Sequence, residues 1–308
     1  MPLFMNKMAL RVKVEATRGT APTLAAADAM LARDVNLTPL EGDEQEFNYV
    51  KPFFGAGGSV MTTVYRKVSF KVPFCGVAAT GNMPGWGVLL RAAAASATVT
   101  SGVKTVFAPV TDGIESVTIE GVIDNQVYRM QGAQLNMKVS CDAKALPWWE
   151  IEATGSFEPV TDSGAMPAVN YAAFLDPIGV NKANTTLSLH GATLIASAFS
   201  FDMGNTVVKR DLIGVDETRI TGRKSVGSVT FENSAVGTKN WVDLVKAGTL
   251  GALVLRHGQA ATNTVKITAP NVQLGKPSFS EQDGVQMIQV PLTFRPTDAG
   301  NDEWAIEA

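Results

Sequence analysis

The chain repeats its own ending, and this internal duplication constrains the fold more than any other feature of the sequence. Residues 151–159 end in Phe-Glu-Pro and are followed by Thr-Asp-Ser-Gly at 161–164. Residues 288–296 end in Phe-Arg-Pro and are followed by Thr-Asp-Ala-Gly at 297–300. Both copies therefore finish with a strand that runs into Phe-x-Pro and then a turn of the pattern Thr-Asp-x-Gly.

The repetition extends upstream to one predicted helix and one predicted strand in each copy. The helical motif Trp-x-x-Leu-Leu-Arg-Ala-Ala at 86–93 matches Trp-x-x-Leu-Val-Lys-Ala-Gly at 241–248. An Arg-Lys pair opens a strand before each helix, at 66–67 and at 223–224. A chain of 308 residues has room for two domains of ordinary size. Two copies of one domain suggest pseudo-symmetric assembly, because such a chain needs half as many subunits to close a ring.

The strand pattern predicts a mainly β fold of two tandem β-sandwich or barrel domains, each with one flanking α-helix. Val68, Phe70 and Val72 alternate with polar residues, which is the period of a half-buried strand. One helix within a run of strands favours a sandwich or barrel over βαβ winding. The predicted division is an N-terminal arm at 1–33, a first domain at 34–164, a linker and hairpin at 165–194, and a second domain at 195–308. The arm is either a partly ordered terminus or a segment that docks on a neighbouring subunit.

Capping and turn residues predict where the helices and two hairpins begin and end. The first helix is expected to have Asn82 as its N-cap and Pro84 in its first turn. The second is expected over residues 239–247, with Thr238 as N-cap and Gly248 at its C-terminal end. Asp124-Asn125 predicts a hairpin turn, and a short hairpin in the linker is expected to turn at Gly191.

Charge and cysteine content narrow the possible classes of protein. The net charge is −3 and no basic tract is present, so tight wrapping of nucleic acid phosphates is not expected. Cys75 and Cys141 are interpreted as reduced core thiols, although a disulfide stays open. No apolar stretch reaches the length of a signal peptide or a membrane span, so we expect a chain that is made in the cytoplasm and stays soluble until it assembles.

Motifs for catalysis or cofactor binding are weak. His190 and His257 stand at strand ends without Cys or acidic residues at ligand spacing, so a metal site is not expected. The glycine-rich segment 55–58 is followed by strand-like residues and not by a helix, so it is interpreted as a loop tip. No nucleophile motif of the type G-x-S-x-G occurs. We therefore expect no cofactor, no metal and no catalytic residue.

Two carboxylates and two tryptophans keep a sugar-directed function open. Glu150 and Glu152 share one face of a predicted strand, and a glycosidase needs only two carboxylates. Such a face is usually the solvated side of a strand. Trp148 and Trp149 are adjacent and point to opposite faces, so at most one of them could serve as a sugar platform. Core or interface packing is the preferred interpretation.

An acidic loop and two long polar stretches point to a partner instead. The segment 41–46 is the densest cluster of charge, and it lacks the ligand spacing of a calcium loop. It is either a solvated loop or part of a contact between subunits. Its counterpart at 203–206 is not acidic, so the charge is not required by the fold. Both segments lead into hairpin-like stretches, at 50–65 and 207–221, which are better explained by contacts with a partner.

In their order along the chain, several motifs resemble the tandem-domain tail tube proteins of phages with long, flexible, non-contractile tails. The helix around Trp86 is one of them. The other segments are Leu-Thr-Pro-Leu-Glu-Gly-Asp at 37–43, Asn-Lys-Ala-Asn-Thr-Thr-Leu at 181–187, Phe-Ser-Phe-Asp-Met-Gly-Asn-Thr at 199–206, Ile-Thr-Gly-Arg-Lys at 220–224 and Ala-Gly-Asn-Asp-Glu at 299–303. Together they span nearly the whole chain from about Lys13 onward, and none of them is a catalytic signature.

The resemblance implies a structural virion protein of the phage tail, assembled in the host cytoplasm. Three chains would form a ring with pseudo-sixfold symmetry, and the inner strands of six domains would join into a barrel of ~24 strands, wide enough for an open channel. Rings would stack into a tube through which double-stranded DNA passes transiently during ejection. Three chains bring −9 to each ring, three times the −3 of one chain, so the tube should not grip phosphates. Implied partners are the tape-measure protein and the tail terminator and initiator proteins, without membrane insertion.

Candidate contacts between subunits or rings are charged and aromatic residues in or next to the long stretches. They are Glu41, Asp43, Glu44, Phe53, Phe54, Arg66, Arg210, Asp211, Arg219 and Arg223. One alternative function is a tandem β-sandwich binding module for carbohydrate or receptor at the tail tip. A second is a β-rich hydrolase that uses Glu150 or Glu152. Hollow filaments of the purified protein would favour the tube, and a glycan-binding monomer would favour the module.

Overall fold

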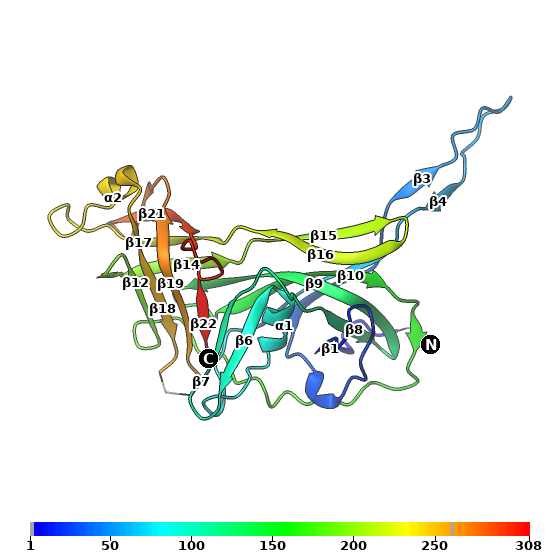
Figure 1. Ribbon diagram of the computed structural model, residues 1–308, viewed down its shortest axis with the longest axis horizontal. Coiled ribbons are helices and arrows are strands. Elements are labelled where there is room, and N and C mark those ends of the chain that lie inside the picture. Colours follow the sequence, from blue (N-terminus) through cyan, green and yellow to red (C-terminus); the bar gives the residue numbers. More distant parts are fainter. Residues whose placement is uncertain (1–2, 260–261) are drawn as a thin grey trace.

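Antiparallel strands dominate the computed structural model, which describes residues 3–259 and 262–308 (Figure 1). The two α-helices of these residues are short, α1 at Gly87–Ala92 and α2 at Trp241–Ala247, and a single 3₁₀ turn covers Ala26–Asp28. The predicted class, mainly β of the sandwich type with one helix in each half of the chain, is confirmed.

The strands fall into two groups along the chain, one on each side of the linker at about residue 170. The first group is β1 Met8–Val14, β2 Arg33–Glu41, β3 Glu44–Glu46, β4 Ser59–Met61, β5 Tyr65–Pro73, β6 Ala95–Thr100, β7 Lys104–Pro109, β8 Val117–Ile123, β9 Gln126–Asp142, β10 Trp148–Phe157 and β11 Thr161–Asp162. The second group is β12 Thr185–Leu189, β13 Ala192–Thr193, β14 Ala196–Asp202, β15 Asn205–Leu212, β16 Val215–Arg223, β17 Val226–Glu232, β18 Leu250–His257, β19 Val265–Leu274, β20 Ser278–Gln282, β21 Val285–Phe294 and β22 Ala305–Glu307.

The two groups have the same order of hydrogen-bonded strands. In the first half the order is β1-β8-β9-β10-β5-β2. In the second half it is β12-β18-β19-β21-β17-β14. Strand β20 continues β19 after a break at residues 275–277 and pairs with the first part of β21, so β19 and β20 together correspond to the long strand β9. The halves are therefore two copies of one topology, although the division into domains at the predicted boundaries stays a prediction.

Buried residues set the register of this repeat. Phe70 lies opposite Ile151, and Phe231 lies opposite Ile288 in the equivalent pair of strands. Residues of β5 and β17 thus correspond with an offset of 161, and those of β10 and β21 with an offset of 137. On this register Arg66 corresponds to Gly227, so the predicted equivalence of the two Arg-Lys pairs is wrong. Arg66 lies inside β5, whereas Arg223 ends β16, and the pairing of the buried apolar residues sets the register of the strands.

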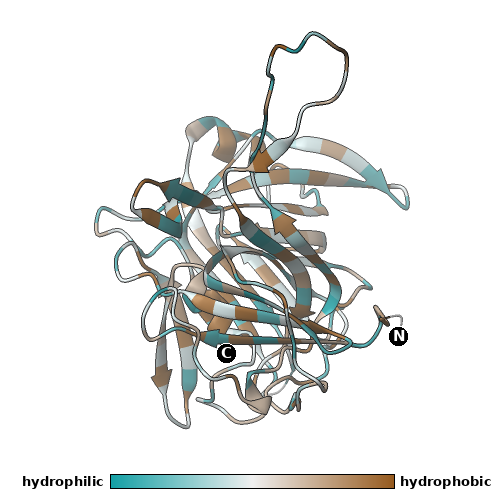
Figure 2. Ribbon diagram, turned by 90° about the vertical axis from the view of Figure 1, so that its right-hand side faces the viewer, coloured by the Kyte–Doolittle hydropathy of each residue, from teal (hydrophilic) through white to brown (hydrophobic). Residues whose placement is uncertain are grey.

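Apolar residues on alternate positions of these strands build a continuous core (Figure 2). In the first half Trp86, Trp149 and Phe74 form a cluster of aromatic rings with centroids 5.1–5.7 Å apart. In the second half Phe201 packs edge-on against Phe294 and Trp304. Each large side chain removed from water contributes about 2 kcal/mol, so the core, and not the short helices, stabilises each half.

The helices begin later than the capping residues predict. Helix α1 has Trp86 at its N-cap position without a side-chain hydrogen bond, so the predicted cap at Asn82 is wrong. Helix α2 is capped by Asn240, whose side chain accepts a hydrogen bond from the backbone of Asp243, and not by Thr238. Its C-terminal end is as predicted, because Gly248 adopts the left-handed conformation with φ 63°.

Both predicted hairpin turns are confirmed. Asp124 and Asn125 join β8 to β9 with positive φ angles of 41° and 78°, which is the conformation that suits a two-residue hairpin loop. His190 and Gly191 join β12 to β13 in the same way.

The N-terminal segment packs on its own chain. Strand β1 pairs along its whole length with β8, and Leu10, Val12 and Met30 are buried in the core of the first half. The predicted strand at residues 8–15 is confirmed. The exposed residues of this segment include the apolar stretch Leu3, Phe4 and Met5.

The two cysteines are expected to be unreactive in the folded protein. Cys75 and Cys141 are free and buried, and burial raises their pKa values to about 11 and about 12. Since only the thiolate is nucleophilic, neither should react with a maleimide at pH 7.5 within hours. Both should react within minutes in 6 M guanidinium, and mass spectrometry of the labelled chain measures this. Labelling of the native protein at either residue would contradict the prediction.

Candidate assembly surfaces

The two halves of the chain are joined edge to edge by strands β9 and β14, a junction that we call the seam. Phe201 lies opposite Val139 and Ser200 opposite Ser140 in an antiparallel register. The backbone N–H of Met203 donates to the carbonyl of Met137 at 3.0 Å. The seam therefore merges β2-β5-β10-β9 of the first half with β14-β17-β21-β20 of the second into one sheet of eight strands.

Side-chain amides reinforce the end of the seam. Asn205 is 8% exposed, and its Nδ2 donates to the carbonyl oxygens of Ala93 at 2.8 Å and Leu135 at 3.3 Å. Asn136 donates through Nδ2 to Asp202 at 2.8 Å and accepts from the backbone of Asn205 at 3.0 Å. Because a buried amide donor is costly when unpaired, the two hydrogen bonds of Asn205 Nδ2 favour this arrangement of the two halves.

The merged sheet ends at two edges that correspond to the two strands of the seam. Strand β2 is equivalent to β14, and β20 is equivalent to the C-terminal part of β9. Within the described residues neither β2 nor β20 has a partner strand on its outer edge. An unpaired edge exposes a row of backbone donors and acceptors, and natural proteins cover such edges or pair them.

Equivalent side chains differ in exposure between the β20 edge and the seam, because β14 lies beside β9 and no strand of the described residues lies beside β20. Phe279 is 57% exposed, whereas its equivalent on β9, Met137, is fully buried beside β14. On the other edge Leu40 of β2 is 45% exposed. Large exposed apolar side chains at a sheet edge are typical of a contact between proteins.

Each half also carries a long hairpin at the same place in its topology. The first extension, residues 42–64, joins β2 to β5, and the second extension, residues 203–225, joins β14 to β17. Both have 23 residues. Both require glycine at the root, because a Cβ added to Gly42 or to Gly204 would lie 1.9 Å from the backbone oxygen of Thr63 or Lys224, where the chain returns to the body. The two extensions are therefore equivalent elements of the repeat.

The second extension lies across the first half of its own chain (Figure 1). Lys209 donates to the hydroxyl of Ser156 at 3.0 Å, and the backbone of Ile220 donates to Gln134 at 2.6 Å. Arg18 donates to the carbonyl of Thr218 at 2.7 Å. This hairpin is thus held at several points along its length.

The first extension, in contrast, projects away from the body of the molecule (Figure 2). Tyr49, Val50, Phe53 and Phe54 are at least two-thirds exposed, and Phe47 stacks on Tyr49 with ring centroids 5.8 Å apart. A solvated hairpin with so many exposed aromatic residues is unstable by itself, so this shape favours a partner for the first extension.

The predicted contact residues separate into three groups. Glu41, Asp43, Glu44, Phe53 and Phe54 lie on or at the root of the first extension. Arg210, Asp211 and Arg219 lie on the second, where Arg210 and Arg219 both pair with Glu217. The third group, Arg66 and Arg223, forms hydrogen bonds within the chain. Arg223 donates to Glu303 and to the carbonyl of Val110, which ties the root of the second extension to both halves.

Arg66 is a fully buried arginine that joins three backbone segments. Its guanidinium donates to the carbonyl oxygens of Pro39, Arg129 and Glu158, and it lies over the ring of Phe157 at 4.6 Å. Burial lowers the pKa of this guanidinium, and the nearby Tyr128 and Glu158 act in the opposite direction. The side chain therefore supplies hydrogen-bond donors to three carbonyl groups at the place where β2, β9 and the end of β10 converge.

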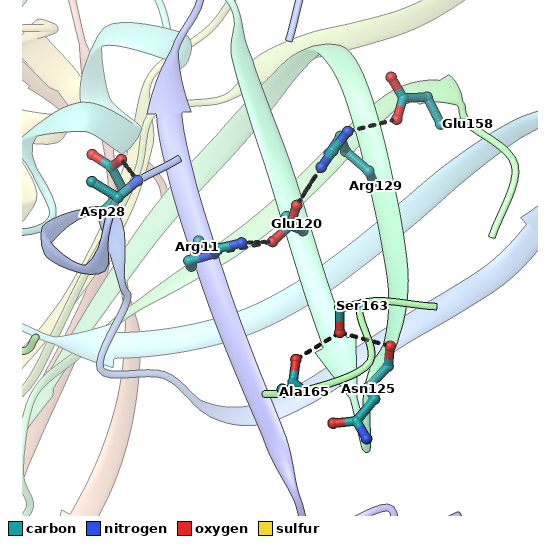
Figure 3. A network of polar contacts seen from close by, with 9 residues as sticks. Arg11, Asp28, Glu120, Asn125, Arg129, Glu158, Ser163 and Ala165 are labelled. Carbon is teal, nitrogen blue, oxygen red and sulfur yellow. Dashed lines mark hydrogen bonds and ion pairs between the residues drawn. The ribbon is translucent and has the colours of Figure 1, made fainter. Parts of the chain in front are cut away.

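A second buried charge of the first half, Glu120, belongs to a network of ion pairs (Figure 3). Glu120 of β8 is 1% exposed and pairs with Arg11 of β1 and with Arg129 of β9, and Arg129 continues to Glu158. This network fixes the N-terminal strand β1 to the sheet. Breaking it by removal of one partner would leave an uncompensated buried charge.

The polar face of the merged sheet carries compensated charges. Lys71 pairs with Glu150 at 2.9 Å, and Lys138 pairs with Glu150 at 3.4 Å and Glu152 at 3.5 Å. In the second half the same face is mostly uncharged, with Ser200, Ser228, Thr230, Gln289 and Thr293. The polar face therefore presents ion pairs and hydroxyl groups with little net charge.

The environment of Glu150 does not suit an acid catalyst. Burial by itself would raise the pKa of this carboxyl, but hydrogen bonds and charges from Lys71 and Lys138 hold it below its ordinary value. A glycosidase acid needs a raised pKa. Of the adjacent tryptophans, Trp149 is buried and Trp148 is half-buried beneath Arg33 at 4.7 Å, so neither provides an open platform.

The histidines serve the packing of the second half. Burial lowers the pKa of His257, and its Nδ1 is 2.9 Å from the hydroxyl of Thr185. His190 lies 2.9 Å from the carbonyl of Val272. Among residues 3–259 and 262–308, no group of three His, Cys, Asp or Glu side chains could hold a metal ion.

Sequence reasoning missed the residues that form the seam. Asn136 lies in no motif, and Asn205 lies in the segment 199–206 without a predicted contact, so only the pairing of distant strands brings the two together. Phe279, on the open edge β20, lies in no motif either. Phe279 could have been suspected from the sequence, because it is a large apolar residue in the otherwise polar segment Ser278–Gln282.

A family model described as phage tail tube protein matches residues 5–296 of the chain. No curated protein matches it. In the part of the chain that the structure describes, no helix has the length and apolar character needed to cross a membrane.

Proposed function

Because the chain belongs to the phage tail tube protein family and is therefore a structural component of the phage tail, we propose that three copies close into a ring with pseudo-sixfold symmetry. Rings then stack into the tube through which double-stranded DNA leaves the virion. The tape-measure protein and the tail terminator and initiator proteins contact this tube, the subunits assemble in the host cytoplasm, and the chain catalyses no reaction.

The single observation that carries the ring is the seam. Strands β9 and β14 join the two halves, and their equivalents β20 and β2 are the two open edges. If β20 of one subunit pairs with β2 of the next in the same way, six equivalent halves follow one another with six equivalent seams. A head-to-tail contact of this kind forms a ring when its rotation closes.

The register of the seam predicts the register between subunits. Ser200 lies opposite Ser140 within the chain. Ser200 corresponds to Thr38, and Ser140 corresponds to Gln282. We therefore expect Thr38 of one subunit to lie opposite Gln282 of the next. In the seam the odd-numbered residues of β9 form the backbone hydrogen bonds to β14, as Met137 does, so Ser140 and Ser200 are a non-hydrogen-bonded pair. The equivalent pair of Thr38 and Gln282 should be of the same kind, with its side chains close together.

Closure also accounts for the size and the surface of a channel. Each chain contributes eight strands to the merged sheet, so three chains build a barrel of ~24 strands, which is wide enough to stay open. The other face of each sheet packs on the core, so the part of the polar face that the extensions leave uncovered lines the channel. Its paired charges and hydroxyl groups offer DNA phosphates no array of free cations, and DNA can slide without being held.

A disulfide across the proposed seam tests the ring. In a chain carrying Thr38→Cys and Gln282→Cys, the Cα atoms of a non-hydrogen-bonded pair lie within the range of an unstrained disulfide. Oxidation should yield covalent dimers and trimers on a non-reducing gel, with the closed trimer as the largest product. The buried native thiols should not interfere.

The matched control moves one cysteine to the opposite face of β20. Thr38→Cys with Glu281→Cys should give little cross-linking, because adjacent residues of a strand point to opposite faces. An unlimited ladder beyond the trimer, or equal cross-linking in both variants, would refute a three-chain ring with this register.

A further inference from the structure

The two extensions are equivalent elements of the repeat, but their surroundings differ. Within the chain, the second extension leaves the second half at Gly204 and lies over β9 and β10 of the first half. The first extension leaves the first half at Gly42, the equivalent position, and projects into solvent. The two hairpins differ in that only one of them has a half-subunit beside it.

We propose that the first extension docks across β20 and β21 of the adjacent subunit in the same ring. This inference rests on the proposed ring, and it names the surface that the first extension occupies there. Where β2 of one subunit pairs with β20 of the next, the second half of that next subunit lies beneath the first extension. The occupant of this surface is therefore a second copy of the chain.

Equivalent residues define the docking surface. Ser156 and Gln134, which hold the second extension, correspond to Thr293 and Lys276. Asn136, which accepts a hydrogen bond from the backbone of Asn205, corresponds to Ser278. Lys276 and Ser278 are exposed, and Thr293 is partly exposed. The surface is thus open in the single chain.

Charge is complementary across this contact. The root of the first extension carries Glu41, Asp43, Glu44 and Glu46, and Asp43 occupies the place of Asn205. Within the chain Asn205 donates to the carbonyl of Leu135, the residue that follows Gln134. Asp43 therefore falls beside Lys276, and Arg295 lies exposed just beyond the end of β21. Opposite charges at a rim steer association and fix its register.

A second disulfide locates the docked extension. In a chain carrying Asp43→Cys and Ser278→Cys, oxidation should produce covalent trimers with a yield similar to that of the Thr38→Cys, Gln282→Cys chain. A chain with Ser140→Cys and Ser200→Cys calibrates the cross-linking, because this non-hydrogen-bonded pair of the seam should form its disulfide inside the monomer. Placing the first cysteine at position 46 instead, by Glu46→Cys, moves it three residues along the hairpin and should abolish the cross-link.

The outcomes separate this inference from the ring. If Thr38→Cys, Gln282→Cys closes trimers and Asp43→Cys, Ser278→Cys does not, the ring stands and the docking site is wrong. If neither chain forms trimers, both the proposed ring and the proposed docking site are wrong.

Protease protection provides a measurement that needs no new cysteine at the contact. Chymotrypsin should cut the exposed Tyr49, Phe53 and Phe54 of the monomer rapidly. In covalent trimers closed by Thr38→Cys and Gln282→Cys, cleavage should be about tenfold slower, as for an extension docked nine-tenths of the time. Adding Lys276→Glu should restore fast cleavage, and adding Lys266→Glu, a lysine on β19 outside the contact, should not. Protection that appears only in stacked tubes would place the extension on the next ring and overturn the proposal.

Discussion

A chain carrying Phe279→Asp is expected to fold normally and to remain monomeric where the parent assembles. Phe279 is 57% exposed in the single chain, so its replacement removes little from the core. In a ring its equivalent position is fully buried, as Met137 is in the seam. An unpaired carboxylate there costs several kcal/mol for each of three seams, which raises the concentration needed for assembly at least ~100-fold. Analytical ultracentrifugation measures this directly.

Two controls distinguish a lost edge from a damaged fold. Phe279→Leu keeps the apolar contact and should assemble like the parent. Val242→Asp places the same charge on the exposed face of α2, where the side chain is 49% exposed, and should also assemble. Assembly of the Phe279→Asp chain at parental concentration would show that the β20 edge is not part of the ring.

Replacing Arg66 by methionine is expected to destabilise the subunit by ~3 kcal/mol. The guanidinium donates to three carbonyl oxygens, and methionine fills a similar volume without any donor. The carbonyl groups of Pro39, Arg129 and Glu158 would then stay buried without these donors, and the contact with Phe157 would lose its cation. Urea denaturation, followed by tryptophan fluorescence, should show a lower midpoint with an unchanged slope.

The neighbouring lysine is a matched control for Arg66. Lys67 is exposed, and its replacement by methionine should change the free energy of unfolding by less than ~0.5 kcal/mol. If both variants had the same stability, the hydrogen bonds of Arg66 would contribute nothing measurable, and its burial would be a matter of space filling alone.

Comparison of the halves explains why the repeat was visible in the sequence while its register was misread. Phe157 and Phe294 end equivalent strands, and Trp86 and Trp241 open equivalent helices, so these motifs mark real equivalences. The Arg-Lys pairs do not. Buried apolar residues keep their spacing because each must face the core, whereas Arg66 and Arg223 each bond to groups that are particular to one place in the fold.

The residues that bind the two halves could not have been predicted in the same way. Asn205 meets Leu135 and Ala93 across distances of 70 and 112 residues in sequence. Such pairs leave no periodic signal. The capping of both helices was misjudged for a related reason, because the tertiary packing of Trp86 and Trp241 decides where each helix begins.

By itself the sequence determined the class of fold, the duplication and the family, because alternating apolar residues and repeated motifs follow directly from which side of a strand faces the core. It also indicated that two long hairpins need partners. Only the tertiary structure decided that one hairpin is already docked while the other is free, and that β9 and β14 form a seam whose equivalents are open edges. The physical reason is that strand pairing is made by backbone groups, which are alike at every residue, so the choice of partner strand is settled by the packing of the whole chain.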